Sequence, residues 1–288
     1  MRVMSEHSAA ADRVTVTIEN GVADVRLNRP DKRNALDPAM FAAIVDAGER
    51  LKTEDGLRAV VLSGEGASFC AGLDFAAFQA MADRPPADAG EDVATDGDVG
   101  DVGAIGRVAE GQITHLGQQA CWVWQEIPVP VIAAVHGHAL GGGLQIALGA
   151  DIRIAHPDTT LSVRELHWGL TPDMTATLTL TRLVRPDVAK ELTFSARLVD
   201  GAEAAALGLV TRLSETPRDD ALAMAADLAQ RSPDAVRGAK ALFGRLLDDH
   251  AAEQFAAERE TIGCLVGTPN KVEAVMAGFE SRPPVFRD

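Results

Sequence analysis

The chain has 288 residues and a mass of 30.3 kDa, with 47% hydrophobic and 24% charged residues. This composition excludes a disordered, collagen-like or disulfide-stabilised mini-protein. The 27 basic and 42 acidic residues give a net charge of -15, which disfavours nucleic acid and anionic membrane surfaces as partners. Three widely spaced cysteines suggest neither a disulfide framework nor a zinc site, and we expect no bound metal.

Two further features of the sequence bear on where in the cell the protein is found. Residues 1–13 are polar and lack the apolar segment of a targeting signal. The most apolar stretch, 127–150, has the length of a membrane span but is interrupted by prolines, glycines and histidines. We therefore expect a soluble, cytoplasmic protein.

The first elements of the chain change from strand to helix periodicity. Residues 14–27 alternate apolar and polar side chains on either side of Asn20-Gly21, which predicts a β-hairpin with a type I′ turn. Asp37 followed by Pro38 predicts the first residues of a helix, because aspartate caps helix N-termini and proline is favoured at the first helical position.

Three short β-rich runs follow, at 58–62, 129–135 and 151–155. Strands separated by helical stretches favour an α/β fold in which parallel neighbours are joined by helical crossovers. From residue 186 onward the chain is rich in alanine, and we expect a helical C-terminal region.

One segment interrupts this organisation. Residues 83–110 contain eight acidic and two basic residues and have no clear periodicity. We predict a flexible acidic insertion, either a lid or a solvated loop without catalytic role. It lies within a core spanning 12–200, which is followed by a helical region over 201–288.

Two glycine-bearing turns follow strand-like runs and are candidates for a ligand site. The first spans 69–74, and the second spans 136–143 and ends in three consecutive glycines. The backbone can approach a ligand closely where no Cβ intervenes. The helix expected from Gly142 presents N–H groups that can hold a phosphate or a developing oxyanion. Neither turn has the spacing of a dinucleotide fingerprint or a phosphate loop.

Six blocks of the chain carry a family resemblance when they are taken in order: 28–36, 69–74, 134–143, 150–153, 165–172 and 279–286. Together they resemble the crotonase (enoyl-CoA hydratase/isomerase) superfamily over about residues 14–286. The resemblance implies a spiral of ββα units with a helical C-terminal region, assembled as a homotrimer or a dimer of trimers. It also implies an acyl-CoA thioester substrate and no separate cofactor, since coenzyme A is part of the substrate.

The resemblance also assigns binding residues. In this family two backbone N–H groups hold the thioester oxygen, and the matching positions are Leu73 and Gly142. Lys32 and Arg33 could contact the phosphates of coenzyme A or lie in a solvated turn, and the sequence is compatible with both. The expected contacts are Lys32, Arg33, Ala35, Ala71, Gly72, Asp74 and Phe75.

The candidate catalytic residues are Glu165, Asp173 and Gln145. Family hydratases use two glutamates, and Gln145 stands at the first of these positions, where its amide can orient a group but cannot transfer a proton. The dienoyl-CoA isomerase branch has carboxylates at the Glu165 and Asp173 positions, although it usually has an aspartate in place of Gln145. A structural alternative is that Asp173 caps a helix over 174–183.

We therefore expect an enzyme that isomerises a double bond of an unsaturated acyl-CoA through an enolate stabilised by the oxyanion hole. Two carboxyl groups buried together should titrate as a coupled pair with one pKa raised. The alternatives are a 2-enoyl-CoA hydratase, a thioester hydrolase and a non-catalytic acyl-CoA binder. Cys70 lies beside the first glycine turn, but no adjacent basic residue marks it as a nucleophile.

Overall fold

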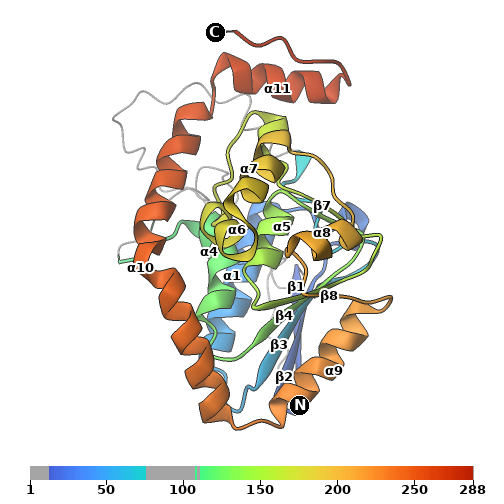
Figure 1. The fold of residues 1–288 in the computed structure, drawn as a ribbon, viewed down its shortest axis with the longest axis vertical. Coiled ribbons are helices and arrows are strands. Elements are labelled where there is room, and N and C mark those ends of the chain that lie inside the picture. The colour runs from blue at the N-terminus through green and yellow to red at the C-terminus, as the bar shows by residue number, and fades with distance from the viewer. Residues whose placement is uncertain (1–12, 76–107, 109–110, 288) are drawn as a thin grey trace, which may run out of the picture.

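The computed structural model describes residues 13–75, 108 and 111–287 (Figure 1). Six strands form the main sheet in the order β1-β2-β3-β4-β6-β8, in which β1 and β2 are antiparallel and the other neighbours are parallel. Strands β5 and β7 form a second, parallel pair. The strands are β1 (Val14–Glu19), β2 (Val22–Leu27), β3 (Ala59–Gly64), β4 (Val131–Val135), β5 (His138–Leu140), β6 (Ile152–Ala155), β7 (Thr160–Ser162) and β8 (Arg212–Leu213).

Helices connect the strands, and the described chain after β8 is mostly helical. This confirms the predicted α/β class with a helical C-terminal region. The α-helices are α1 (Pro38–Lys52), α4 (Leu116–Glu126), α5 (Gly142–Leu148), α6 (Ala176–Leu183), α7 (Pro186–Ser195), α8 (Gly201–Leu207), α9 (Pro217–Ala229), α10 (Pro233–Leu265) and α11 (Pro269–Phe279). Two 3-10 helices are η1 (Pro30–Lys32) and η2 (Glu165–Trp168).

The hairpin and the first helix form where local sequence predicts them. Asn20 and Gly21 have φ angles of 51° and 80°, the left-handed conformations that a type I′ turn requires. The Asp37 side chain accepts a hydrogen bond of 2.8 Å from the N–H of Met40, and Pro38 is the first helical residue. Both predictions are confirmed.

Alternate residues of β3 face two different layers. Val60 and Leu62 lie in the large core shared with α1, α4 and α5, whereas Ala59 and Val61 pack against α9. Figure 1 shows α9 alongside β2 and β3. The strand is buried on both faces, as is usual for parallel strands covered by helices on each side.

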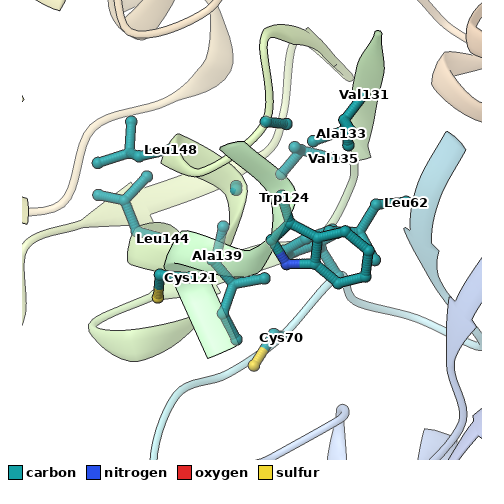
Figure 2. Packing of buried hydrophobic residues seen from close by; sticks show 14 of the residues in the cluster. Leu62, Cys70, Cys121, Trp124, Val131, Ala133, Val135, Ala139, Leu144 and Leu148 are labelled. Atoms are coloured by element: carbon teal, nitrogen blue, oxygen red, sulfur yellow. The ribbon is translucent and has the colours of Figure 1, made fainter. Parts of the chain in front are cut away.

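The core between the sheet and α5 surrounds Trp124 (Figure 2). This side chain is fully buried, and its Nε1 donates a hydrogen bond of 3.0 Å to the carbonyl of Ala120, which satisfies its one polar group. Leu144 and Leu148 of α5 belong to the same cluster. This packing fixes α5 on the sheet and thereby fixes the position of its glycine-rich N-terminus.

Helix α10 is 33 residues long and runs along the body of the molecule (Figure 1). Its Phe255 packs edge-on against Trp122 of α4, with ring centroids 5.0 Å apart, and Leu178 of α6 joins the same cluster. This contact brings the second half of α10 next to the elements that form the site.

Two sequence predictions stay open in the described part of the chain. Apart from Val108, the acidic segment 83–110 lies outside the described residues. The division into a core over 12–200 and a helical region over 201–288 stays a prediction. Among the described helices, none combines the length and the apolar character needed to cross a membrane.

Candidate active site

A cavity of about 810 Å³ lies between the two glycine-bearing turns, η2 and α10, a volume typical of a small-molecule site. It brings together every site residue that the sequence predicts except Gln145, which lies behind its wall. The predicted residues in the lining are Lys32, Arg33, Ala35, Ala71, Gly72, Leu73, Asp74, Phe75, Gly142, Glu165 and Asp173.

The first glycine turn directs the N–H of Leu73 away from the neighbouring segment. Leu36 donates to the carbonyl of Gly72 at 2.8 Å and accepts from the N–H of Asp74 at 3.0 Å. Because Leu36 pairs with the residues on either side of Leu73, the Leu73 N–H points to the opposite side. Gly142 is the first residue of α5, so its N–H has no acceptor within the helix. Both residues line the cavity.

The two turns approach one another because of glycines. A Cβ on Gly143 would lie 2.3 Å from the carbonyl oxygen of Cys70. Gly72 has a φ of 90°, and a Cβ there would lie 2.7 Å from the carbonyl oxygen of Leu140. Side chains at these positions would separate the turns, so the glycines are needed for close backbone contact.

Asn34 connects the loop after β2 to the loop that precedes the first glycine turn. It is fully buried, and its Nδ2 donates to the carbonyls of Glu65, Ser68 and Phe69 at 3.0, 2.8 and 3.1 Å. Its Oδ1 accepts from the N–H of Arg29 at 2.7 Å. The sequence presented Asn34 only as part of a matched block, and this bridging role was missed.

The predicted coenzyme A contacts differ in their surroundings. Lys32 and Arg33 are exposed at the cavity and are available to a charged ligand. Asp74, in contrast, is mostly buried and forms an ion pair of 2.5 Å with Arg29. Its carboxylate therefore holds the loop after β2 against the first glycine turn.

An aromatic cluster forms another part of the wall. The ring of Phe75 lies 6.3 Å from that of Trp168 and 5.8 Å from that of Phe279, measured between centroids. Phe75 and Trp168 both line the cavity, whereas Phe279 comes from the end of α11. The C-terminal region thus supports an apolar part of the cavity.

Glu165 is the buried carboxylate of the site. Its Oε1 accepts a hydrogen bond of 2.6 Å from Nε2 of Gln145, and its Oε2 is buried without a hydrogen-bond partner among the described residues. Burial raises the pKa of Glu165 to about 7, because desolvation disfavours the ionised form. A carboxyl group with such a pKa can accept or donate a proton near neutral pH.

Gln145 has a fixed amide orientation. Its Oε1 accepts hydrogen bonds from the N–H groups of Met174 and Ala176, at 3.0 and 3.1 Å. Since these partners are donors, the opposite end of the amide must be the Nε2 that contacts Glu165. Gln145 is 1% exposed and acts on the Glu165 carboxylate and on the backbone.

Asp173 is half-buried and lines the same cavity. Burial, followed by the nearby charges of Glu165 and Glu258, raises its pKa to about 8. The alternative in which Asp173 caps a helix over 174–183 is wrong. Helix α6 begins at Ala176, and the cap position is occupied by Thr175.

Cys70 lies next to these groups but is not an activated thiol. It is fully buried, its Sγ donates to the carbonyl of Asn34 at 3.1 Å, and burial raises its pKa to about 12. The thiol is therefore protonated at neutral pH. Within residues 13–75, 108 and 111–287, no group of three or more His, Cys, Asp or Glu side chains is arranged to hold a metal ion.

Helix α10 contributes residues that the sequence did not single out. Arg259, Ile262 and Gly263 of this helix line the cavity, together with Val266, which follows its last residue. Glu258 lies behind the lining, is 3% exposed and bonds to the segment that carries Asp173. No local signal marks these residues, because their contacts are with parts of the chain far away in sequence.

The chain is similar to known proteins over most of its length. The profile of the enoyl-CoA hydratase/isomerase family matches residues 22–284. The chain is 32% identical over 281 residues to a human mitochondrial Delta(3,5)-Delta(2,4)-dienoyl-CoA isomerase, covering 96% of this chain and 81% of that protein. It is 30% identical over 273 residues to the mouse mitochondrial enoyl-CoA hydratase domain-containing protein 2, covering 92% of this chain and 84% of the relative.

Solved structures agree as well. An enoyl-CoA hydratase/isomerase from Pseudoalteromonas atlantica T6c superimposes with a TM-score of 0.79 at 27% identity, covering 96% of this chain and 100% of that one. The predicted crotonase-like fold is thus confirmed. The family profile matches most of the chain, and relatives named as a dienoyl-CoA isomerase and as an enoyl-CoA hydratase domain-containing protein are about 30% identical to it. The chain therefore belongs to the enoyl-CoA hydratase/isomerase family.

Proposed function

We propose that this protein is an isomerase that converts a 3,5-dienoyl-CoA into a 2,4-dienoyl-CoA. One observation carries the proposal: two carboxyl groups whose pKa values are raised toward neutrality, Glu165 and Asp173, line one cavity with the backbone of Leu73 and Gly142. A proton shift along a conjugated thioester needs an acid, a base and a site for the developing oxyanion.

The chemistry balances without a co-reactant. The N–H groups of Leu73 and Gly142 donate to the thioester oxygen, which stabilises the negative charge that develops there. The ionised carboxylate of Glu165 takes a proton from C2, and the electron pair of that C–H bond passes into the conjugated enolate. The carboxylic acid of Asp173 then gives its proton to C6, which leaves double bonds at C2 and C4.

The surroundings of the two carboxyl groups support these roles. Burial raises the pKa of both, but the hydrogen bond from Gln145 favours the ionised form of Glu165, whereas the charges of Glu165 and Glu258 favour the protonated form of Asp173. Glu165 is then the base and Asp173 the acid at the start of a turnover. After the reaction the proton has moved to Glu165, and exchange with solvent restores the starting state.

Hydration receives less support from the site. A hydratase would need a second acid–base group beside the water, at the position of Gln145. The Oε1 of Gln145 is occupied by backbone N–H groups and its Nε2 by Glu165. This amide therefore has no acceptor left to activate a water molecule. A hydratase working with Glu165 alone is the second candidate, and a non-catalytic acyl-CoA binder is the third.

The remaining sequence predictions belong to the same proposal. Coenzyme A is bound as part of the substrate, with Lys32 and Arg33 next to its phosphates, and no other cofactor takes part. The protein assembles as a homotrimer or a dimer of trimers. The cytoplasmic location also stays a prediction, since some relatives are named as mitochondrial proteins.

The test is an absorbance assay with 3,5-dienoyl-CoA and 2-enoyl-CoA substrates of equal chain length. We expect the wild type to form the 2,4-dienoyl chromophore, and we expect Glu165→Gln and Asp173→Asn each to lose at least 100-fold in kcat. The control is Glu253→Gln, which removes an exposed carboxylate from α10 and should leave kcat unchanged.

Other outcomes would overturn the isomerase proposal. Consumption of 2-enoyl-CoA that depends on Glu165 but not on Asp173 would identify a hydratase. Release of free thiol would identify a hydrolase. Coenzyme A ester binding without turnover, and without solvent deuterium entering the bound acyl group, would identify a binder.

A further inference from the structure

Two side chains hold the segment that follows Asp173. The four successive N–H groups of residues 174–177 bond to them in alternation. Gln145 accepts from the first and third, at 3.0 and 3.1 Å, and Glu258 accepts from the second and fourth, at 2.9 and 3.2 Å. Gln145 comes from α5 and Glu258 from α10, so the segment is held between the glycine-rich helix and the C-terminal helix (Figure 1).

The held segment has a strained backbone. Thr175 has a φ of 78°, a left-handed conformation that β-branched residues rarely adopt. Its N–H is one of the two that Glu258 accepts. A residue keeps such a conformation only where its surroundings determine it, and the two side chains provide that restraint.

Glu258 is arranged to accept hydrogen bonds with both carboxylate oxygens. Oε2 accepts from the N–H of Thr175 and from Nε2 of Gln118 at 3.2 Å. Oε1 accepts from the N–H and from the hydroxyl of Thr177, the latter at 2.5 Å. Within the described part of the chain Glu258 forms no ion pair, so these donors and the N-terminus of α6 stabilise its charge.

Four titratable groups lie around this carboxylate. Burial lowers the pKa of Arg259, the next residue of α10, and the Glu258 charge opposes this effect. Across the segment lie Asp173 and Glu165, and the Glu258 charge raises the pKa of both. Cys121 of α4 is fully buried, and burial followed by the Glu258 charge raises the pKa of its thiol, which is uncharged. The other neighbours from α4 and from the start of α6 carry no charge: Gln118, Thr175 and Thr177.

We propose that Glu258 is a positioning residue: its hydrogen bonds to residues 175 and 177 set the place of the Asp173 carboxyl group in the cavity. Asp173 belongs to no described helix or strand, so these bonds and those of Gln145 determine its path. The catalytic consequence rests on the proposed function, because it assigns Asp173 the proton that is returned to the substrate. A misplacement of about 1 Å is enough to lower such a transfer substantially.

The hydrogen bonds are tested without turnover, by amide exchange resolved at single residues with NMR. In Glu258→Gln the side-chain amide has one oxygen acceptor where the carboxylate has two. The N–H of either Thr175 or Thr177 therefore loses its acceptor. We expect protection to fall at least tenfold at Thr175 or Thr177 and to stay within twofold at Met174 and Ala176. Glu253→Gln should change neither pair. Equal protection in Glu258→Gln and the wild type would overturn the proposal.

The catalytic role is tested by kinetics on 3,5-dienoyl-CoA. We expect Glu258→Gln to lower kcat about tenfold with KM within twofold, and Glu258→Asp to recover part of this loss. A lower Tm with kcat unchanged would mean that Glu258 serves only stability, which overturns the proposal. A wild type that does not turn over dienoyl-CoA would instead refute the proposed function, and the exchange experiment would still decide whether Glu258 holds the segment.

Discussion

Gln145 donates a hydrogen bond of 2.6 Å from Nε2 to Oε1 of Glu165, and its own oxygen is fixed by two backbone N–H groups. This contact directs one oxygen of the buried carboxylate toward the protein and leaves Oε2 without a protein partner among the described residues. The glutamine thus sets the orientation of the Glu165 carboxylate without adding a second negative charge beside it.

Replacing this amide by a carboxylate tests that arrangement. In Gln145→Glu two carboxyl oxygens would lie about as close as the present 2.6 Å contact and would have to share a proton. We expect the pH at which the rate rises to move upward by about one unit or more. The measurement is kcat against pH from 5.5 to 9.5. Gln230→Glu adds the same charge at an exposed position and should leave the profile in place, and an unshifted profile for Gln145→Glu would contradict the prediction.

Stability should fall as pH rises through the range in which the two carboxyl groups ionise. Glu165 and Asp173 have pKa values of about 7 and 8 in the folded protein, against about 4 in an unfolded chain. The folded state therefore binds more protons between pH 4 and 8. The stability associated with these groups is present below pH 4 and is lost as pH rises through their folded pKa values.

The double variant Glu165→Gln, Asp173→Asn removes this dependence. Between pH 5 and pH 8 the free energy of unfolding of the wild type should fall relative to that of the variant by on the order of 6 kcal/mol, because both groups contribute. Reversible urea unfolding at the two pH values measures the difference. A constant difference between the two proteins would show that neither carboxyl group is protonated by burial.

The close contact of the two glycine turns can be tested at Gly143. In Gly143→Ala the new Cβ would lie 2.3 Å from the carbonyl oxygen of Cys70, so α5 has to move and the N–H of Gly142 moves with it. We expect kcat to fall about 10- to 100-fold and the protein to be destabilised by about 1–3 kcal/mol. A Cβ added at Gly238 in α10 would meet no atom within 4 Å outside its own helix turn. Gly238→Ala should therefore stabilise the protein by about 0.5–1 kcal/mol and leave kcat unchanged. Equal kcat for the two variants would contradict a role for this contact in catalysis.

The basic residues at the cavity are tested with two forms of one substrate. If Lys32 and Arg33 contact the phosphates of coenzyme A, replacing both by alanine should raise KM for the coenzyme A ester about tenfold, and less at high salt. The same acyl group on pantetheine, which carries no phosphate, should show no change. Arg182→Ala with Lys190→Ala removes two exposed cations elsewhere and is the control. An unchanged KM for the coenzyme A ester would favour the solvated turn, and an equal rise for both substrates would show that the effect does not act through the phosphates.

Local signals predicted the parts of the fold that depend on neighbouring residues. The Asn20-Gly21 turn and the Asp37 cap form because the turn and the helix start are determined within a few residues. The close contact of the two glycine turns could also be predicted, since consecutive glycines mark a close approach of the backbone. The alternative in which Asp173 caps the following helix is wrong, because Gln145 and Glu258 accept the N–H groups at the start of this helix instead.

The groups that the sequence did not reveal act over long separations. Asn34 joins two loops more than 30 residues apart. Glu258 lies on an ordinary amphipathic helix, and only the packing of α10 on α4 and α6 brings it to the segment after Asp173. The residue type of Gln145 was informative, but its bond to Glu165 and to the backbone follows from the fold.

The place of Glu258 in the chain has a consequence for biosynthesis. The sheet, both glycine turns, Gln145, Glu165 and Asp173 all precede α9, so a ribosome makes them before α10. The strained turn at Thr175 has no partner from the C-terminal helix until residue 258 has left the exit tunnel. A nascent chain stalled before that point contains every strand of the sheet but not the side chain that accepts the N–H groups of Thr175 and Thr177. On the proposed role of Glu258, the segment that carries Asp173 is therefore the last part of the site to be fixed.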